Sequence, residues 1–573
     1  MSGRETAWDT GEGAAAILAP ESGLVARLDS SDFGESVAAA MRRAAAHPGA
    51  VAAANVRFAG RLARVGPAAL GRWFGSDAEP PVPVDDKDRR FSDPAWEDNP
   101  AYFALRQTYL AALALAEEVL AAGRSEADAS LTDGKAEMAT KLLFDALAPT
   151  NFLPTNPAAL KRAFDTAGGS LVAGARHFID DVRHNGGRPR QVDTSSFHLG
   201  ENLAATPGRV VFRNDLMELI QYAPQTDQVN AVPLLASPPW INKYYVMDLA
   251  PGRSFIEWAV QHGRTVFAIS YRNPDATMRG VTLDDYLIQG PRTALDVVSD
   301  ITGADTVDIV GLCMGGALTA MTAAYLIDAG DTRIGSVTLL NTLLDYSNPG
   351  ALGLFTDEKT VANLEKQMAA KGFLEGSNMA TTFDLMRAND LIFNYVVSNW
   401  LMGQDPPAFD ILAWNADSTR MPAAMHSFYL RSLYMKNQLA LGELEIAGQR
   451  LSLSDVKSDA YIVGAINDHI VPWEASYHAT HLLAGEVRYV LSSGGHIAGI
   501  VNPPNPKAWY EVAEENPTEP SQWREATTRH SGSWWEDWLQ WGVERAGPLG
   551  PPPPLGSDRY PALGEAPGEY VRG

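Results

Sequence analysis

The most reactive side chain in the sequence is its only cysteine, Cys313, which lies in the motif Gly-Leu-Cys-Met-Gly at 311–315. The apolar residues before the motif predict a strand, and the residues after it predict a helix. A strand, a Gly-x-Cys-x-Gly turn and a helix form a nucleophile elbow, in which small neighbours let the strand and the helix approach each other. The N–H groups at the amino end of a helix favour a thiolate, so we expect Cys313 to be a covalent nucleophile.

An acid and a base follow at positions that suit such a nucleophile. Asp468 comes just after the predicted strand 460–466, and His496 follows the predicted strand 487–491 and two glycines. The chain order nucleophile, acid, histidine is that of α/β-hydrolases, in which all three residues reach the carboxyl edge of the sheet. We therefore predict that His496 is the base and that Asp468 orients it. His469 is a competing base, but it adjoins the acid, so its side chain should leave in another direction.

Two main-chain N–H groups are expected to form an oxyanion hole. One is that of Met314, directly after the cysteine. The other should come from the loop 238–243, in which two prolines fix the backbone and leave the N–H groups of Trp240 and Ile241 free. We favour Ile241; the alternative is a rigid turn that positions nothing. No metal site is predicted, because no cluster has ligand spacing.

The elements that must position these residues alternate between strands and helices. Strands are predicted at 210–213, 231–235, 265–270, 306–311 and 336–341 as well as at the two positions above, and helices at 284–301 and 315–329. This alternation indicates a mostly parallel sheet, an α/β-hydrolase fold over 196–573. Residues 1–195 predict a mainly helical domain. Between about 344 and 453 the alternation lapses in a Met- and aromatic-rich stretch, which predicts a cap over the site.

Composition restricts the class of protein. The net charge of −23 argues against a nucleic-acid partner, and a single cysteine cannot form an internal disulfide, which suits a reducing cytoplasm. No run approaches the ~20 apolar residues of a transmembrane segment. The aromatic stretch 534–541 predicts a helix anchored on the domain rather than a ligand site.

From about residue 91 onward, the sequence resembles the class I poly(3-hydroxyalkanoate) synthases. The resemblance rests on NFLPTNP at 151–157, NLAATPG at 202–208, PPWINKYY at 238–245, SYRNPD at 270–275, GLCMGG at 311–316, WNAD at 414–417, DHIVPW at 468–473 and GHIAG at 495–499. It implies a nucleophile at Cys313, a base at His496 and an acid at Asp468. At two positions where the resemblance leads us to expect Trp, the sequence carries Tyr271 and Phe393. These departures bear on the preference for acyl-chain length and leave the expected chemistry unchanged.

The resemblance also implies a substrate and partners. The substrate would be (R)-3-hydroxyacyl-CoA, with CoA as a product and no separate cofactor, and the protein would be a homodimer on the surface of cytoplasmic storage granules. A Cys-dependent thioesterase or lactone hydrolase, and a catalytically idle granule-coat protein, remain as alternatives. Because CoA is anionic, we expect basic residues near the site, and Lys243 and Arg272 are candidates. Each has a structural alternative; Arg272 would simply pair with Asp275.

Overall fold

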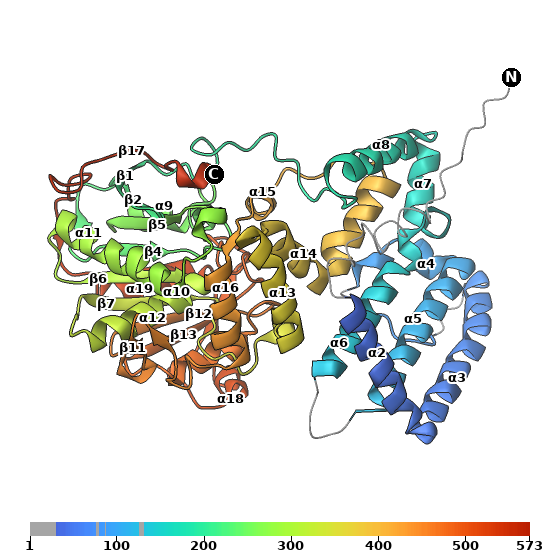
Figure 1. Cartoon of the computed structure of the whole chain (residues 1–573). Coiled ribbons are helices and arrows are strands. Elements are labelled where there is room, and N and C mark those ends of the chain that lie inside the picture. Colours follow the sequence, from blue (N-terminus) through green and yellow to red (C-terminus); the bar gives the residue numbers. More distant parts are fainter. Residues whose placement is uncertain (1–29, 76–78, 86–87, 125–130) are drawn as a thin grey trace. The chain divides into compact units, whose positions relative to one another are not determined.

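The computed structural model describes residues 30–75, 79–85, 88–124 and 131–573, which form two compact units (Figure 1). The first unit contains the chain up to Asp193 together with residues 378–407. The second unit contains residues 194–377 and 408–573. The stretch 378–407 lies inside the predicted cap, yet it packs with the N-terminal helices.

The first unit is helical, as the sequence predicts. Its longer helices are α2 (Ser30–Ala45), α3 (Pro48–Trp73), α5 (Pro100–Ala121), α6 (Leu131–Ala146), α7 (Pro157–Asp165) and α8 (Gly169–His184). Helices α3, α5 and α7 each begin with a proline, whose fixed φ suits the first helical position and whose missing N–H costs nothing there. Asn99 and Asn156 cap α5 and α7 by accepting from main-chain N–H groups in the first turn.

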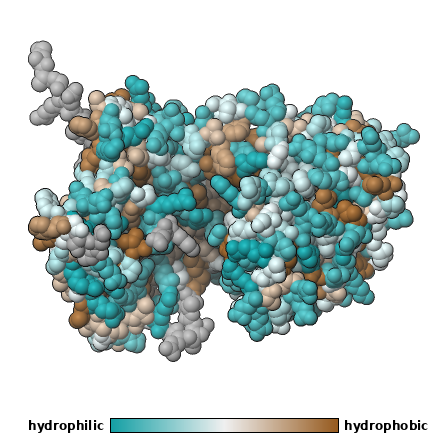
Figure 2. All heavy atoms as spheres, turned by 180° about the vertical axis from the view of Figure 1, so that it is seen from behind, coloured by the Kyte–Doolittle hydropathy of each residue, from teal (hydrophilic) through white to brown (hydrophobic). Residues whose placement is uncertain are grey.

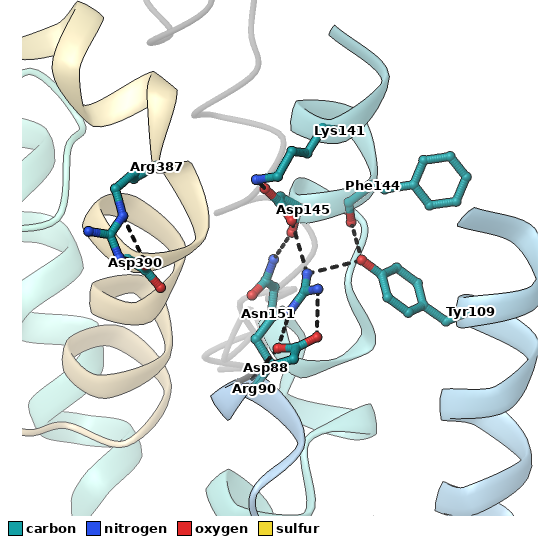
Figure 3. Close-up of polar contacts among 9 residues, drawn as sticks. All are labelled: Asp88, Arg90, Tyr109, Lys141, Phe144, Asp145, Asn151, Arg387 and Asp390. Carbon is teal, nitrogen blue, oxygen red and sulfur yellow. Dashed lines mark hydrogen bonds and ion pairs between the residues drawn. The ribbon is translucent and has the colours of Figure 1, made fainter. Parts of the chain in front are cut away.

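The half-buried Arg90 links its own segment to helices α5 and α6 (Figure 3). Arg90 pairs with Asp88 (Nη2–Oδ2, 2.8 Å) and with Asp145 (Nη1–Oδ1, 3.0 Å), and it donates to the hydroxyl of Tyr109 at 3.0 Å. The main-chain oxygen of Asp145 accepts from Asn151 Nδ2 at 2.7 Å. Loss of the guanidinium would leave the Asp145 carboxylate without its main counter-charge, so this cluster stabilises the helical unit.

The second unit is built on an eleven-stranded sheet with the order β15-β14-β13-β12-β7-β6-β4-β5-β2-β1-β17. The six strands from β5 to β13 run parallel, and the outer strands on both sides are antiparallel. The strands are β1 (Gly208–Arg213), β2 (Met217–Tyr222), β4 (Leu234–Ser237), β5 (Val266–Tyr271), β6 (Val307–Leu312), β7 (Ile334–Leu340), β12 (Asp459–Ala465), β13 (Val487–Ser492), β14 (Trp509–Val512), β15 (Thr528–Ser531) and β17 (Gly564–Glu565).

The predicted strands correspond to β1, β5, β6, β7, β12 and β13 within two residues, and the sheet is the predicted α/β type. The strand predicted at 231–235 begins later, as β4, after Pro233, which has no N–H to donate to a ladder. The sequence interpretation missed β2, β14, β15 and β17. Polar residues in short edge strands such as β15, which is fully exposed, carry little hydrophobic pattern.

Helices cover the sheet. Helix α12 (Met314–Asp328) packs on β6 and β7. The helix predicted at 284–301 is divided into α10 (Leu283–Leu287), the π-helical turn η7 (Ile288–Arg292) and α11 (Thr293–Thr302), because Pro291 lacks an N–H and Gly290 leaves helical φ/ψ.

The predicted aromatic helix is α19 (Trp534–Val543), and it is anchored on the domain. The rings of Trp534 and Trp538 lie 5.5 and 4.8 Å from that of Phe255 in α9 (Phe255–Gln261). Trp538 Nε1 also donates to Thr338 Oγ1 on β7 at 3.0 Å. All three tryptophan and phenylalanine rings are buried, so the helix is part of the core.

Within the predicted cap, α13 (Glu358–Lys371), α15 (Asp410–Ala416) and α16 (Ala423–Tyr429) belong to the second unit. The π-helical turns Asn389–Phe393 and Val396–Leu401 belong to the first. On the face shown in Figure 2, apolar residues form scattered patches among polar ones. Among the described residues, none of the helices has the length and apolarity that a bilayer span requires.

Candidate active site

Cys313 lies at the turn between β6 and α12, in a backbone conformation (φ 52°, ψ −117°) that non-glycine residues rarely adopt. The two motif glycines make this turn possible. A Cβ on Gly311 would lie 2.5 Å from the oxygen of Gly315, and a Cβ on Gly315 would lie 2.1 Å from the oxygen of Ser237. Both distances are far below van der Waals contact, so only glycine fits at either position. The strained turn leaves the thiol half-buried at the amino end of α12.

The loop 238–243 lies directly against the first turn of α12. The position of a Cβ on Gly315 is 2.6 Å from the oxygen of Pro238. The oxygen of Trp240 accepts from Thr419 Oγ1 at 2.7 Å, which fixes the middle of the loop. Ile241 follows, half-buried, and Met314 is the first residue of α12, whose first N–H groups have no acceptor within the helix. The two predicted oxyanion donors therefore belong to segments in contact.

His496 and Asp468 form a buried hydrogen-bonded pair. His496 Nδ1 lies 2.7 Å from Asp468 Oδ2, and the two side chains are 8% and 0% exposed. The other carboxylate oxygen, Oδ1, accepts from the N–H groups of Ile470 (2.8 Å) and Val471 (2.9 Å). Both oxygens of Asp468 are thus engaged. His469, the competing base, does not take the place of His496 at this carboxylate.

The electrostatics of His496 link it to Cys313. The pKa of His496 is raised to about 10: burial disfavours the charged ring, but the Asp468 carboxylate and then the charge of Cys313 outweigh it. A hydrogen bond from each of these partners adds to the effect. The raised pKa favours the protonated form of His496 beside Asp468.

Asn341 holds the main chain of His496. It follows β7 with a positive φ of 42°, and its N–H donates to the oxygen of Val463 at 2.8 Å. Its Nδ2 donates to the main-chain oxygen of His496 at 2.5 Å. The sequence interpretation missed this residue, although an asparagine at the end of a strand suits a positive φ.

Aromatic side chains form a wall beside the cysteine that the sequence interpretation did not identify. The hydroxyls of Tyr346 and Tyr429 lie 3.3 Å apart, and the ring of Tyr434 is 4.9 Å from Tyr346 and 5.6 Å from Tyr429. Burial raises the pKa of all three, and the charge of Cys313 contributes to each shift. Trp240 from the loop 238–243 contacts Tyr429, with ring centroids 6.5 Å apart. The wall is apolar with polar tips, which suits an acyl group.

The two basic residues expected to meet CoA make structural contacts. Lys243 is 3% exposed and its Nζ donates to the main-chain oxygen of Gly573; burial lowers its pKa. Arg272 is paired with Asp275 (Nη2–Oδ2, 2.6 Å), as in the structural alternative. A role for either residue in CoA binding stays a prediction.

The two positions where Trp was expected lie in different units. Tyr271 ends β5 and is buried against Trp240, with ring centroids 6.0 Å apart. Phe393 is buried in the first unit among Leu385 and Trp400. In the described ranges, no three His, Cys, Asp or Glu side chains gather as metal ligands do. That the protein needs neither metal nor cofactor stays a prediction.

Comparison with known proteins gives consistent matches. Residues 87–259 match the family model described as the N-terminus of poly-beta-hydroxybutyrate polymerase (PhaC), and residues 241–503 match that of the alpha/beta hydrolase fold. The poly(3-hydroxyalkanoate) polymerase of Methylorubrum extorquens is 43% identical over 507 residues, which cover 88% of this chain and 84% of the relative. The polymerase subunit of Rhizobium meliloti is 42% identical over 506 residues, covering 88% and 82%. That of Cupriavidus necator is 42% identical over 498 residues, covering 85% and 83%.

Proposed function

Because the chain belongs to the family of poly(3-hydroxyalkanoate) polymerases, we propose that it transfers (R)-3-hydroxyacyl groups from CoA thioesters to a growing polyester through an acyl-enzyme on Cys313. The observation that carries this mechanism is the buried pair of His496 Nδ1 and Asp468 Oδ2, 2.7 Å apart, whose histidine is electrostatically coupled to the cysteine. A nucleophile, a base in reach of it and a third group that orients the base are what covalent acyl transfer requires.

The first step loads the enzyme. The Cys313 thiolate attacks the carbonyl carbon of the acyl-CoA, and the N–H groups of Met314 and Ile241 stabilise the oxyanion that forms. The carbon–sulfur bond to CoA then breaks, and the imidazolium of His496 gives its proton to the leaving CoA thiolate. One thioester replaces another, so this step needs little driving force.

The second step lengthens the chain. The 3-hydroxyl of another hydroxyacyl group attacks the thioester carbonyl of the acyl-enzyme, and the neutral His496 takes the hydroxyl proton. The carbon–sulfur bond to Cys313 breaks, so an ester replaces the thioester and the Cys313 thiolate is restored. We assign this proton to His496 and not to Asp468, because both oxygens of Asp468 already accept hydrogen bonds and its side chain is fully buried. Asp468 then keeps one role, which is to hold the ring and stabilise its charge.

Two alternatives remain to be separated by their products. A thioesterase or lactone hydrolase with the same residues would use water to resolve the acyl-enzyme and would yield a free acid with CoA. A granule-coat protein would release no CoA. Family membership favours the polymerase over both alternatives, and the coupling of Cys313 to the pair of His496 and Asp468 argues against a catalytically idle protein.

The partners follow from this function. We propose that the protein acts as a homodimer on the surface of cytoplasmic polyester granules, since its product is an insoluble chain that stays attached during growth. Sedimentation of the protein alone and with amorphous polyester particles tests both parts. A monomer at micromolar concentration that does not sediment with the particles contradicts them.

Cys313→Ala tests the mechanism. Loss of a covalent nucleophile costs several orders of magnitude in rate. We expect no CoA release above background, no polymer, and an unchanged melting temperature, because the side chain is small and half-buried. Retention of more than about a tenth of the wild-type turnover would exclude covalent catalysis at this residue.

A further inference from the structure

Two buried hydrogen-bond donors near the cysteine have no acceptor. Trp240 and Tyr271 are 3% and 7% exposed. In the part of the chain that the structure describes, neither Trp240 Nε1 nor Tyr271 Oη forms a hydrogen bond. A buried donor without a partner destabilises a fold, so its presence in a native structure requires a reason.

Other aromatic rings surround Trp240. The Trp240 ring packs against Tyr271, Tyr286 and Tyr429, with centroids 6.0, 4.9 and 6.5 Å away. Its own main-chain oxygen is held by Thr419. Burial raises the pKa of Tyr271 and the nearby hydroxyl of Ser237 acts in the opposite direction, but the two hydroxyls do not reach hydrogen-bond geometry.

The position of this pair distinguishes it from other unsatisfied groups. Trp258 on α9 and Trp523 on α18 (Pro520–Glu525) also have indole N–H groups without a partner, so that property alone indicates no site. Trp240, in contrast, directly precedes Ile241 in the loop that lies against the first turn of α12. Its ring also contacts Tyr429, and the charge of Cys313 contributes to the raised pKa of Tyr429.

We propose that Trp240 Nε1 and Tyr271 Oη form a subsite that binds an ester carbonyl of the growing polyester. When the first unit of the chain is bound to Cys313, this carbonyl belongs to the second unit. This inference rests on the proposed function. Two neutral donors among aromatic rings suit a neutral carbonyl oxygen better than a charged group. In a 3-hydroxyacyl polyester, carbonyls recur every four chain bonds, about 5 Å in an extended chain. Trp240 directly precedes Ile241, so its indole N–H belongs to the loop that would meet the first carbonyl.

The subsite therefore distinguishes a chain from a single unit. A monomer carries a hydroxyl where a dimer carries an ester, so the monomer leaves the two donors unpaired. Sites with buried donors disfavour substrates that lack the matching acceptor. The expected consequence is slow priming by monomers and faster transfer once an ester carbonyl is present.

The test compares two thioesters under single-turnover conditions, with enzyme in excess: (R)-3-hydroxybutyryl-CoA and the CoA thioester of its linear ester dimer. We expect wild type to release CoA from the dimer at least threefold faster. Tyr271→Phe removes one donor and keeps the ring, whereas Trp240→Phe removes the other donor and replaces the indole by a smaller phenyl ring. Each should slow the dimer about 3–10-fold, as loss of one hydrogen bond does, and slow the monomer less than it slows the dimer.

Trp258→Phe is the matched control, since it removes an unpartnered indole N–H on α9, and it should alter neither rate. Equal wild-type rates for dimer and monomer, or equal slowing of both thioesters in Trp240→Phe, overturn the subsite while the proposed function stands. If wild type releases CoA from neither thioester, the proposed function itself fails. The wild-type comparison needs no variant, so misfolding of a variant cannot hide the answer.

Discussion

Replacing Asp468 by Asn changes one atom in the buried pair and has a consequence that the geometry determines. In wild type, Oδ1 accepts from the N–H groups of Ile470 and Val471, at 2.8 and 2.9 Å, and Oδ2 accepts from His496 Nδ1 at 2.7 Å. The asparagine has only one oxygen for these three donors. Its amide must therefore choose between two orientations.

The magnitudes decide the orientation. If the oxygen faces His496, the NH2 group opposes two buried main-chain N–H groups, at roughly 1–3 kcal/mol for each donor left unpaired. If the oxygen stays with Ile470 and Val471, only the histidine is affected, and it can change its tautomer. The second orientation wins. His496 Nδ1 then accepts from the NH2 group, and the ring proton moves to Nε2, on the side of Cys313, where a base must have no proton.

We expect Asp468→Asn to lower the rate of CoA release about 10³–10⁴-fold, the range seen when a triad aspartate is replaced by asparagine. The melting temperature should change little, because both main-chain hydrogen bonds persist. Alkylation of Cys313 at neutral pH should slow, since the carboxylate that favours the imidazolium is gone.

Asp459→Asn is the control, at the start of the same strand β12, where the carboxylate pairs with Arg545 at 2.9 Å near the surface. It should keep wild-type turnover. The reasoning is refuted if Asp468→Asn keeps more than about a tenth of wild-type activity. It is also refuted if activity falls only in proportion to the fraction of unfolded protein.

Three further predictions concern the same site. His496→Gln should abolish CoA release and His469→Gln should not. Because the pKa of His496 is raised from 6.5 to about 10, its stabilising contribution is complete below pH 6.5 and is lost as the pH rises toward 10. The difference in unfolding free energy between wild type and His496→Gln should therefore shrink over that range, and a constant difference would contradict the pairing. Gly315→Ala should destabilise the protein by about 1–3 kcal/mol and reduce turnover, since its Cβ would lie 2.1 Å from a main-chain oxygen. Gly280→Ala, where the added Cβ has nothing within 4 Å, should change neither stability nor turnover. Chemical denaturation and a turnover assay measure the two effects. Lys243→Gln should lower the melting temperature and leave the salt dependence of KM unchanged, because the amine is buried and donates to the main-chain oxygen of Gly573. A raised KM with an unchanged melting temperature would instead show that Lys243 binds CoA.

The sequence alone determined the elements whose signals are local. The elbow around Cys313 is recognisable because strand, turn and helix lie within a few residues, and the slots of Asp468 and His496 follow from the strands just before them. The helical N-terminal region and the buried parallel strands were predictable for the same reason. Short polar edge strands such as β15 carry no such pattern, and they were missed.

The tertiary structure decided what depends on distant residues. Asn341 binds the main chain of His496 across 155 positions, and Lys243 binds Gly573 across 330. The wall of Tyr346 and Tyr429 forms only because the chain between them folds back on the elbow. An unpaired donor such as Trp240 Nε1 has no signature in sequence at all, because what defines it is the set of atoms around it, which close packing of remote segments supplies.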